Sequence, residues 1–175
     1  MFRQLLAKSP ARRSGERLYA AAAAHSRSPA LYADLGVPDT VEGRFEILTL
    51  HVILLIDRLN RDDAGDSAVR QTLFDAYVSN LDGALREMGV GDLGVGKRMR
   101  KLGEAFYGRA RAYEAAFLAF PDLQSLEDLI DRTVFEGASS ATAPNLADYI
   151  RRCRHDLALG DISTLVAGDP AWASP

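Results

Sequence analysis

The sequence contains a single cysteine, Cys153, and no apolar run long enough to cross a membrane as a helix. One thiol excludes a disulfide framework and a zinc site built from cysteines. The longest apolar run, Ile47 to Ile56, is interrupted by Thr49 and His51, whereas a membrane-spanning helix needs about 20 residues. The 175 residues are 47% hydrophobic and 26% charged with a formal net charge of −3, which excludes wholesale disorder and is typical of one globular domain.

Acidic residues are scarce at the start of the chain. Up to Arg27, Glu16 is the only acid, whereas six residues are Lys or Arg. A start that is rich in Arg and poor in acids is found in mitochondrial presequences. The alternative is a basic first helix that is capped by Ser14 and preceded by a loose tip. We therefore predict a basic and flexible tip over residues 1–13, a helical domain over 14–167 and a frayed tail over 168–175.

The remaining chain has the periodicity of helices and no alternating pattern of a strand. Asp39 and Glu42 have the spacing of a capping box, Gly89 is placed to end a helix, and Gly103 and Gly108 lie inside a long helical stretch, where we expect a close helix crossing or a kink. We predict an all-α single-domain bundle of six to seven helices. Besides the basic first helix, the main helices are expected after residue 39 to about 60, from about 70 to 88, 92–120, 125–137 and 144–160, with loops at 61–65 and 138–143.

Two glycine motifs resemble nucleotide-binding sequences. Gly89, Gly91 and Gly94 have the spacing G-x-G-x-x-G, but a predicted helix and not a strand precedes them. The following Lys97 fits most of a phosphate-binding loop, but Arg98 stands where a Ser or Thr should bind magnesium. We therefore predict a helix–helix turn and no nucleotide cofactor.

The titratable residues show no catalytic or metal-binding constellation. The three histidines are scattered, and Cys153 with His155 has too few companions to bind a metal. His51 lies in the most apolar helix and is expected in the core or in a groove. An enzyme using His51 and Asp57 is the least favoured alternative, because residues six apart do not share a helical face. We predict that the protein is not an enzyme and has no cofactor.

Basic residues cluster in the long predicted helix. Between positions 97 and 111, Glu104 is the only acid against six basic residues, namely Lys97, Arg98, Arg100, Lys101, Arg109 and Arg111. This face is either simply solvated or docks a negative partner, such as an anionic membrane surface, ribosomal RNA or an acidic protein. A small ribosome- or RNA-binding module that uses the basic face around Lys97 is therefore an alternative function.

Three blocks of the sequence resemble the ubiquinol–cytochrome c chaperone family. The similarity covers roughly residues 19–159, and the Val-Pro-Asp-Thr form of the first block is similar to the alphaproteobacterial branch. The blocks are LGVPDTVEGRFEILTLH at 35–51, LREMGVGDLGVGKRM at 85–99, and AFYGR at 105–109 followed by AYE at 112–114.

The resemblance implies an all-helical assembly chaperone for respiratory complex III that binds newly made cytochrome b. It also implies a possible contact with the ribosome, a possible small partner subunit, and a place in the bacterial cytoplasm at the inner membrane, or in the mitochondrial matrix of a eukaryote. Because cytochrome b offers long apolar helices, a groove between the second and third amphipathic helices would suit it. The groove candidates are Phe74, Tyr77, Phe106 and Tyr107; the further partner-binding candidates are Asp39, Arg44, His51, Lys97, Arg98, Lys101 and Arg109.

Overall fold

The computed structural model describes residues 9–61, 67–137 and 141–175, and these contain eight helices and no strand. The all-α single-domain prediction is confirmed, and two five-residue helices account for the higher number of elements. Residues 1–8 of the predicted basic tip, 62–65 of the first predicted loop and 138–140 of the second lie outside the described residues, whereas residues 10–13 of the tip are helical. The helices are α1 (Pro10–His25), α2 (Pro29–Ala33), α3 (Val41–Arg61), α4 (Ser67–Glu87), α5 (Asp92–Leu118), α6 (Gln124–Thr133), α7 (Ala143–Leu159) and α8 (Ile162–Val166).

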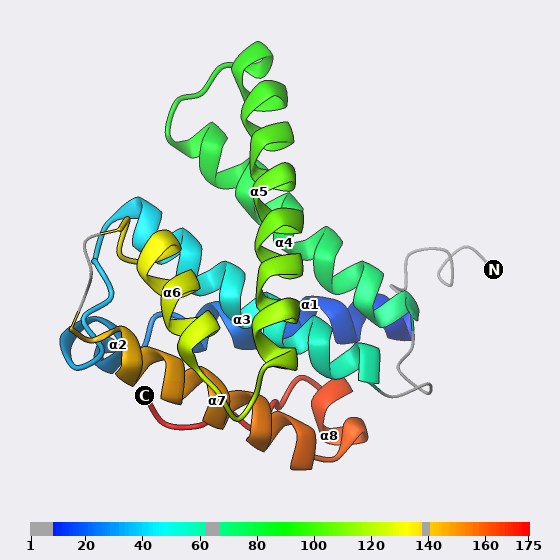
Figure 1. Cartoon of the computed structure of the whole chain (residues 1–175). Helices are drawn as coiled ribbons and strands as arrows, with labels where there is room; N and C mark the ends of the chain where they lie inside the picture. The colour runs from blue at the N-terminus through cyan, green and yellow to red at the C-terminus, as the bar shows by residue number, and fades with distance from the viewer. Residues whose placement is uncertain (1–8, 62–66, 138–140) are drawn as a thin grey trace.

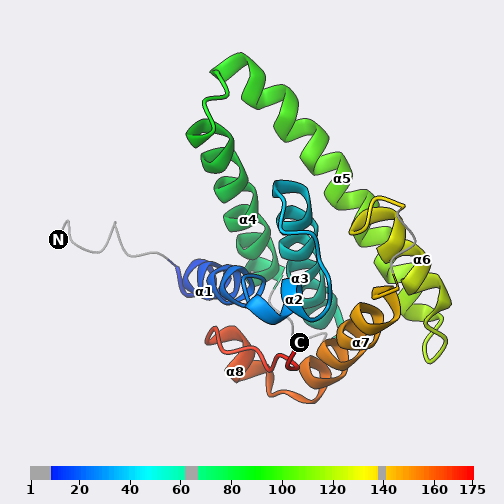
Figure 2. The ribbon, with the colours of Figure 1, turned by 90° about the vertical axis from the view of Figure 1, so that its left-hand side faces the viewer.

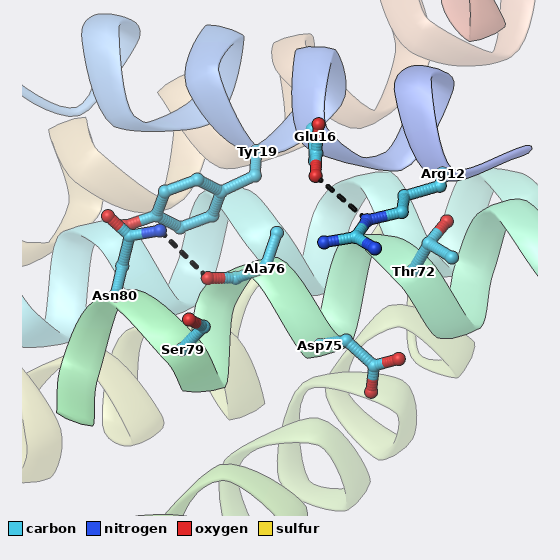
Figure 3. A pocket seen from close by; sticks show the side chains of 8 residues that line it. All are labelled: Arg12, Glu16, Tyr19, Thr72, Asp75, Ala76, Ser79 and Asn80. Atoms are coloured by element: carbon cyan, nitrogen blue, oxygen red, sulfur yellow. Dashed lines mark hydrogen bonds and ion pairs between the residues drawn. The ribbon is translucent and has the colours of Figure 1, made fainter. Parts of the chain in front are cut away.

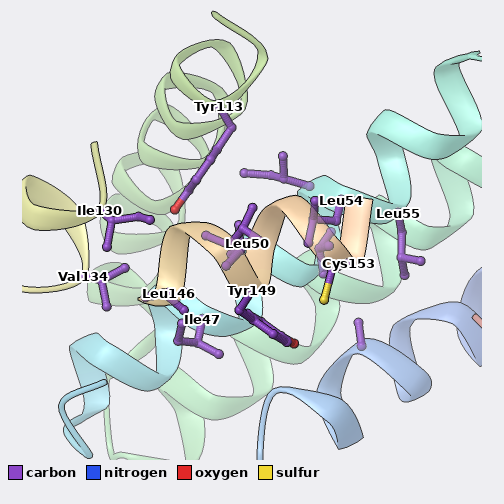
Figure 4. Packing of buried hydrophobic residues seen from close by; sticks show 14 of the residues in the cluster. Ile47, Leu50, Leu54, Leu55, Tyr113, Ile130, Val134, Leu146, Tyr149 and Cys153 are labelled. Atoms are coloured by element: carbon purple, nitrogen blue, oxygen red, sulfur yellow. The ribbon is translucent and has the colours of Figure 1, made fainter. Parts of the chain in front are cut away.

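Helix α3 forms the centre of the bundle and contacts α1, α4, α5 and α7 (Figures 1 and 2). Its apolar residues cover more than one face, as expected of a helix that is surrounded by others. The core between α3 and α7 contains Ile47, Leu50, Tyr149 and Cys153, all fully or almost fully buried (Figure 4). This continuous core explains why the chain folds as one domain.

Helices α4 and α5 form a hairpin whose connected ends project away from the rest of the bundle (Figures 1 and 2). Helix α4 ends as predicted at Gly89, which has φ +81°. The amide of Gly89 donates to Arg86 O at 2.9 Å and that of Val90 donates to Leu85 O at 3.1 Å, which is the bonding pattern of a Schellman motif. The turn at Gly89 to Gly91 therefore joins two helices, in agreement with the interpretation of the glycine motifs.

The close helix crossing lies at Gly15 and not at the glycines of α5. A Cβ atom at Gly15 would overlap Thr72 Oγ1 and lie 2.6 Å from the backbone nitrogen of Leu73, so only glycine allows α1 and α4 to approach this closely. A Cβ at Gly103 or Gly108 would meet nothing within 4 Å. The expectation of a close crossing within α5 was therefore wrong.

Two predicted helix caps were assigned to the wrong residue. Helix α1 begins after Ser9, whose side chain accepts from Arg12 N, and Ser14 lies inside the helix. Before α3, the amide of Gly43 donates to Thr40 Oγ1 at 3.0 Å, so Thr40 and not Asp39 is the cap. Before each of these helices, two polar residues that could serve as the cap lie close together. For α1, Pro10 in the first turn favours the earlier start.

The end of the chain packs on the bundle where a frayed tail was expected. Pro170 and Ala173 are buried. The Trp172 ring stacks on His25 with 5.0 Å between the ring centroids and contacts His51 edge-on at 5.1 Å. These contacts fix the last residues against α1 and α3, because Trp172 supplies a large apolar surface for burial.

Candidate functional site

An open groove lies between α4 and α5 beside the C-terminal half of α3. Its volume is about 570 Å³, and we call it the α4–α5 groove. The aromatic rings of Phe74 and Tyr107 lie 5.8 Å apart by centroid, and Tyr107 is 57% exposed. The groove is lined by Ile56, Phe74, Phe106, Tyr107 and Ala110, with Ser67, Ala68, Arg70 and Gln71 at its α4 side. It therefore presents an apolar, aromatic surface that water can reach.

A second hollow adjoins this groove along α5. It has a volume of about 300 Å³ and shares Ile56 and Ala110 with the α4–α5 groove, so the two hollows are neighbours, and we call them together the depression along α5. At its far end Leu118 is 82% exposed. From Tyr107 to Leu118 the helix axis rises about 16 Å, which is about three turns of a helix laid alongside.

One wall of the second hollow is charged. Asp57 accepts from Arg61 at 2.9 Å and from Arg154 at 3.0 Å. The Arg154 guanidinium also lies over the Phe117 ring, 4.5 Å from its centroid. Burial raises the pKa of Asp57, whereas the charge of Arg61 and its hydrogen bond act in the opposite direction. The second hollow thus has an apolar floor and a wall of balanced charges, in which Asp57 and Glu114 stand against Arg61 and Arg154.

The four aromatic groove candidates do not share one environment. Phe74 and Tyr107 lie at the groove surface as predicted, whereas Phe106 is only 4% exposed and contributes to its floor. Tyr77 is 1% exposed, and its hydroxyl lies 2.8 Å from Thr49 Oγ1 in the core. Because its side chain has no accessible surface, the proposal of Tyr77 as a partner contact is corrected to a core residue.

His51 also belongs to the core and not to a surface. Its Nδ1 lies 2.7 Å from Ile47 O and its Nε2 lies 2.8 Å from the Tyr149 hydroxyl. A carbonyl only accepts, so Nδ1 donates to Ile47 and Nε2 accepts from Tyr149. His25 Nε2 then donates to the same Tyr149 oxygen at 2.8 Å. Since His51 is completely buried, its predicted partner contact is also corrected to a core position.

The proposed pairing of His51 with Asp57 in an enzyme is not formed. His51 is engaged by Ile47 and Tyr149, whereas Asp57 is engaged by Arg61 and Arg154. Burial lowers the pKa of His51 to about 3, so this imidazole stays neutral in its hydrogen-bonded position. The arrangement offers no base–carboxylate pair at an accessible surface.

Arg109 is part of an interhelical ion pair. Its Nε and Nη2 donate to the two carboxylate oxygens of Glu46 at 2.9 and 2.7 Å, which joins α5 to α3. Glu46 is 7% exposed and the hydrogen bond to it raises the pKa of Arg109. The predicted docking contact of Arg109 is therefore corrected to a positioning contact for α5.

The other predicted charged contacts lie at the surface. Lys97, Arg98 and Lys101 are exposed on α5, and within the described part of the chain none of them forms an ion pair. Arg44 pairs with Asp39, and its guanidinium lies 5.4 Å from the centroid of the Tyr32 ring. Asp39 and Arg44 therefore form a local pair that leaves both exposed, whereas the three residues on α5 have their charges free for a partner.

A further hollow between α1 and α4 is polar (Figure 3). It has a volume of about 480 Å³, and its lining includes Arg12, Glu16, Tyr19 and Asn80. Arg12 bonds to Glu16 at 3.1 Å, and Asn80 donates to Ala76 O at 2.9 Å. Because these groups are bonded within their own helices, they are not free to hold a ligand, and the apolar depression along α5 is the better candidate site.

The sequence did not indicate the residues that extend the site. Ile56, Ala110 and Leu118 come from α3 and α5, and only the packing of the two helices brings them together. For Leu118, helical periodicity was a usable signal, because the residue lies away from the apolar stripe of α5 and on the side of Arg100 and Arg111. For Arg154 there was no such signal, since its partner Asp57 is 97 residues away.

The fold and the site define a helical protein with an open apolar depression, a surface of the kind that accepts a helix of a partner. The model of the ubiquinol-cytochrome C chaperone family matches residues 33–172, and the chain belongs to this family. A structure described as the crystal structure of the Cbp3 homolog from Brucella abortus matches with a TM-score of 0.83 and 35% identity, over 94% of this chain and 91% of that chain. A comparison with curated proteins gave no match.

The family assignment confirms the resemblance seen in the three sequence blocks. Among the described residues, no helix is both long enough and apolar enough to cross a membrane.

Proposed function

We propose that this chain is an assembly chaperone for ubiquinol–cytochrome c reductase that binds newly made cytochrome b at the inner face of the membrane. Membership of the chaperone family supports the assignment to ubiquinol–cytochrome c reductase. The depression along α5 carries the more specific proposal, because it supplies an accessible apolar surface for a client. Contacts with the ribosome and with a small partner subunit, implied by the family resemblance, belong to the same proposal.

The shape of the depression suits one helix of the client. Phe74 and Tyr107 form its aromatic end and Leu118 its far end, about three helical turns away. An apolar helix that has left the ribosome but has not yet packed in its complex exposes side chains that aggregate readily. Burying such a helix against Tyr107 and Leu118 would shield it without any chemical reaction.

Two arginines in the charged wall of the second hollow suit the C-terminal end of such a helix. The C-terminal end of a helix carries partial negative charge, and Arg154 and Arg61 lie beside the apolar floor. Asp57 holds both guanidinium groups in place. The proposal therefore assigns binding energy to the apolar floor and orientation to the arginines.

A complementation experiment in the source organism tests the proposal. Deletion of the gene should lower spectroscopically detected cytochrome b and assembled complex III while other respiratory complexes remain. The Tyr107→Glu variant, with a charge in the groove, should fail to restore cytochrome b at equal protein level. The Leu159→Glu variant is the matched control, because Leu159 is 75% exposed and does not line the depression.

A normal cytochrome b spectrum in the deletion strain would overturn the proposed function. Equal restoration by the Tyr107→Glu and Leu159→Glu variants would instead overturn the assignment of the groove. A photo-reactive side chain at Tyr107 supplies a direct measurement, because it should crosslink to cytochrome b during synthesis and the same group at Leu159 should not.

A further inference from the structure

The tip of the α4–α5 hairpin exposes apolar side chains at the point farthest from the core. Leu93 is 98% exposed and Met88 is 56% exposed, so two of the six large hydrophobic residues with the highest exposure flank one short turn. Leu85 and Val95 are buried in the hairpin but lie outside the main core cluster, so the projecting part has packing of its own. The exposed pair is thus held on an ordered element.

Basic residues follow this apolar tip along α5. From Arg86 to Lys101 there are five basic and two acidic residues. Arg86 is bonded to Asp82 and Asp92, which leaves Glu87 as the remaining acid of this stretch. Lys97, Arg98, Arg100 and Lys101 are exposed and, within the described residues, form no ion pair. Glu104 lies one turn farther from the tip and is also exposed.

The order of these groups along α5 matches the layers of a membrane surface. Leu93, Lys97 and Lys101 are spaced four residues apart and therefore lie on one face of the helix. They follow one another at about 6 Å along the axis. Apolar side chains of interfacial helices enter about 5–10 Å below the headgroups, so a hairpin that enters tip first would bring its lysines to the phosphates.

We infer that the α4–α5 hairpin tip docks on an anionic lipid bilayer, with Leu93 and Met88 entering the interface and the basic residues from Lys97 to Lys101 contacting lipid phosphates. This inference specifies the membrane contact in the proposed function, but it requires no client protein. The phosphates of a nucleic acid could bind the basic residues equally well. A nucleic acid would not explain why Leu93, at the tip of the hairpin, is fully exposed. The apolar tip therefore favours lipid.

Sedimentation of the purified full chain with vesicles tests the inference. The chain should bind vesicles of phosphatidylcholine mixed with phosphatidylglycerol and should bind weakly to phosphatidylcholine alone. The variant Lys97→Ser with Lys101→Ser should lose about fivefold in affinity per lysine. The variant Leu93→Ser with Met88→Ser should lose about tenfold or more. Leu159→Ser, on a different helix, is the control and should bind as the parent chain does.

A fluorescent reporter gives an independent measurement of tip insertion. Cys153 is buried, so an environment-sensitive dye can be attached selectively to a Leu93→Cys variant. Its emission should shift to the blue with anionic vesicles, whereas the same dye on Leu159→Cys should not respond.

Equal vesicle binding by all variants, or no binding to anionic vesicles, would overturn the inference. Salt-sensitive binding to ribosomal RNA that depends on Lys97 and Lys101 but not on Leu93, without vesicle binding, would assign the tip to nucleic acid instead. The vesicle and RNA measurements do not depend on the groove. The Tyr107→Glu variant, which is altered in the groove, should therefore still bind vesicles. Loss of cytochrome b in the deletion strain would then support the proposed function even if the tip inference failed.

Discussion

The hydroxyl of Tyr149 lies 2.8 Å from Nε2 of the buried His51, although 98 residues separate them in the chain. The same oxygen accepts from His25 on α1. One side chain of α7 thereby satisfies polar groups on two other helices, where an unpaired group would be costly. Trp172 covers both imidazole rings, which explains why the end of the chain is ordered.

Removal of this hydroxyl should destabilise the fold. In Tyr149→Phe the ring still fills its site, but the buried Nε2 of His51 loses its donor, which should lower the free energy of unfolding by about 1–3 kcal/mol. Urea denaturation followed by circular dichroism measures the change. The control is Tyr107→Phe at an exposed position, for which a change within about 0.5 kcal/mol is expected. Equal stability of the two variants would refute the assigned hydrogen bonds.

Stability should fall as the pH is lowered from 6.5 to 5. Burial lowers the pKa of His51 from 6.5 to about 3 and also lowers that of His25. The unfolded chain therefore binds a proton at His51 below pH 6.5 that the folded chain does not bind until about pH 3. The free energy of unfolding should decrease by up to about 1.4 kcal/mol per pH unit from His51, with a further contribution from His25.

The pH dependence can be assigned with two variants. In His51→Gln the slope between pH 6.5 and 5 should decrease, whatever the stability at neutral pH. In His155→Gln the slope should stay as in the parent, because His155 is exposed. An unchanged slope in His51→Gln would show that other groups cause the dependence.

The ends of several helices could be predicted because local chemistry determines them. Gly89 and Gly160 follow the last residues of α4 and α7, and Pro144 lies in the first turn of α7. The cap of α1 was missed although Pro10, which suits the first turn of a helix, favours Ser9 over Ser14. Thr40 was missed because the adjacent Asp39 is an equally suitable cap residue.

The candidate site could be predicted only in part. Periodicity placed Phe74 and Tyr107 on facing helices, and both lie in the groove. Periodicity gave no measure of depth, so Tyr77, one turn after Phe74, was assigned to the surface although it is buried. Glu46, the partner of Arg109, and Tyr149, one of the two partners of His51, lie on other helices, and a single sequence does not specify which helices meet.

Loss of the bond between α5 and α3 should be costly. Arg109→Met would leave the carboxylate of Glu46 buried without its partner and should lower the free energy of unfolding by about 1.5–3 kcal/mol. Adding Glu46→Gln to this variant should recover part of the loss, because the buried charge is removed. Arg111→Met, two residues away and exposed, is the control. Urea denaturation of the parent chain, the two single variants and the double variant measures these differences. An equal loss of stability in Arg109→Met and Arg111→Met would contradict the buried ion pair.

The two kinds of glycine should respond oppositely to alanine. Gly15→Ala would force α1 away from the backbone of Leu73 and should lower the free energy of unfolding by about 1–3 kcal/mol. Gly103→Ala would place a methyl group in open space within α5 and should raise it by about 0.5–1 kcal/mol through the better helix propensity of alanine. Thermal and urea denaturation of both variants measure the difference. A stabilised Gly15→Ala protein would mean that α1 and α4 are farther apart than in this structure.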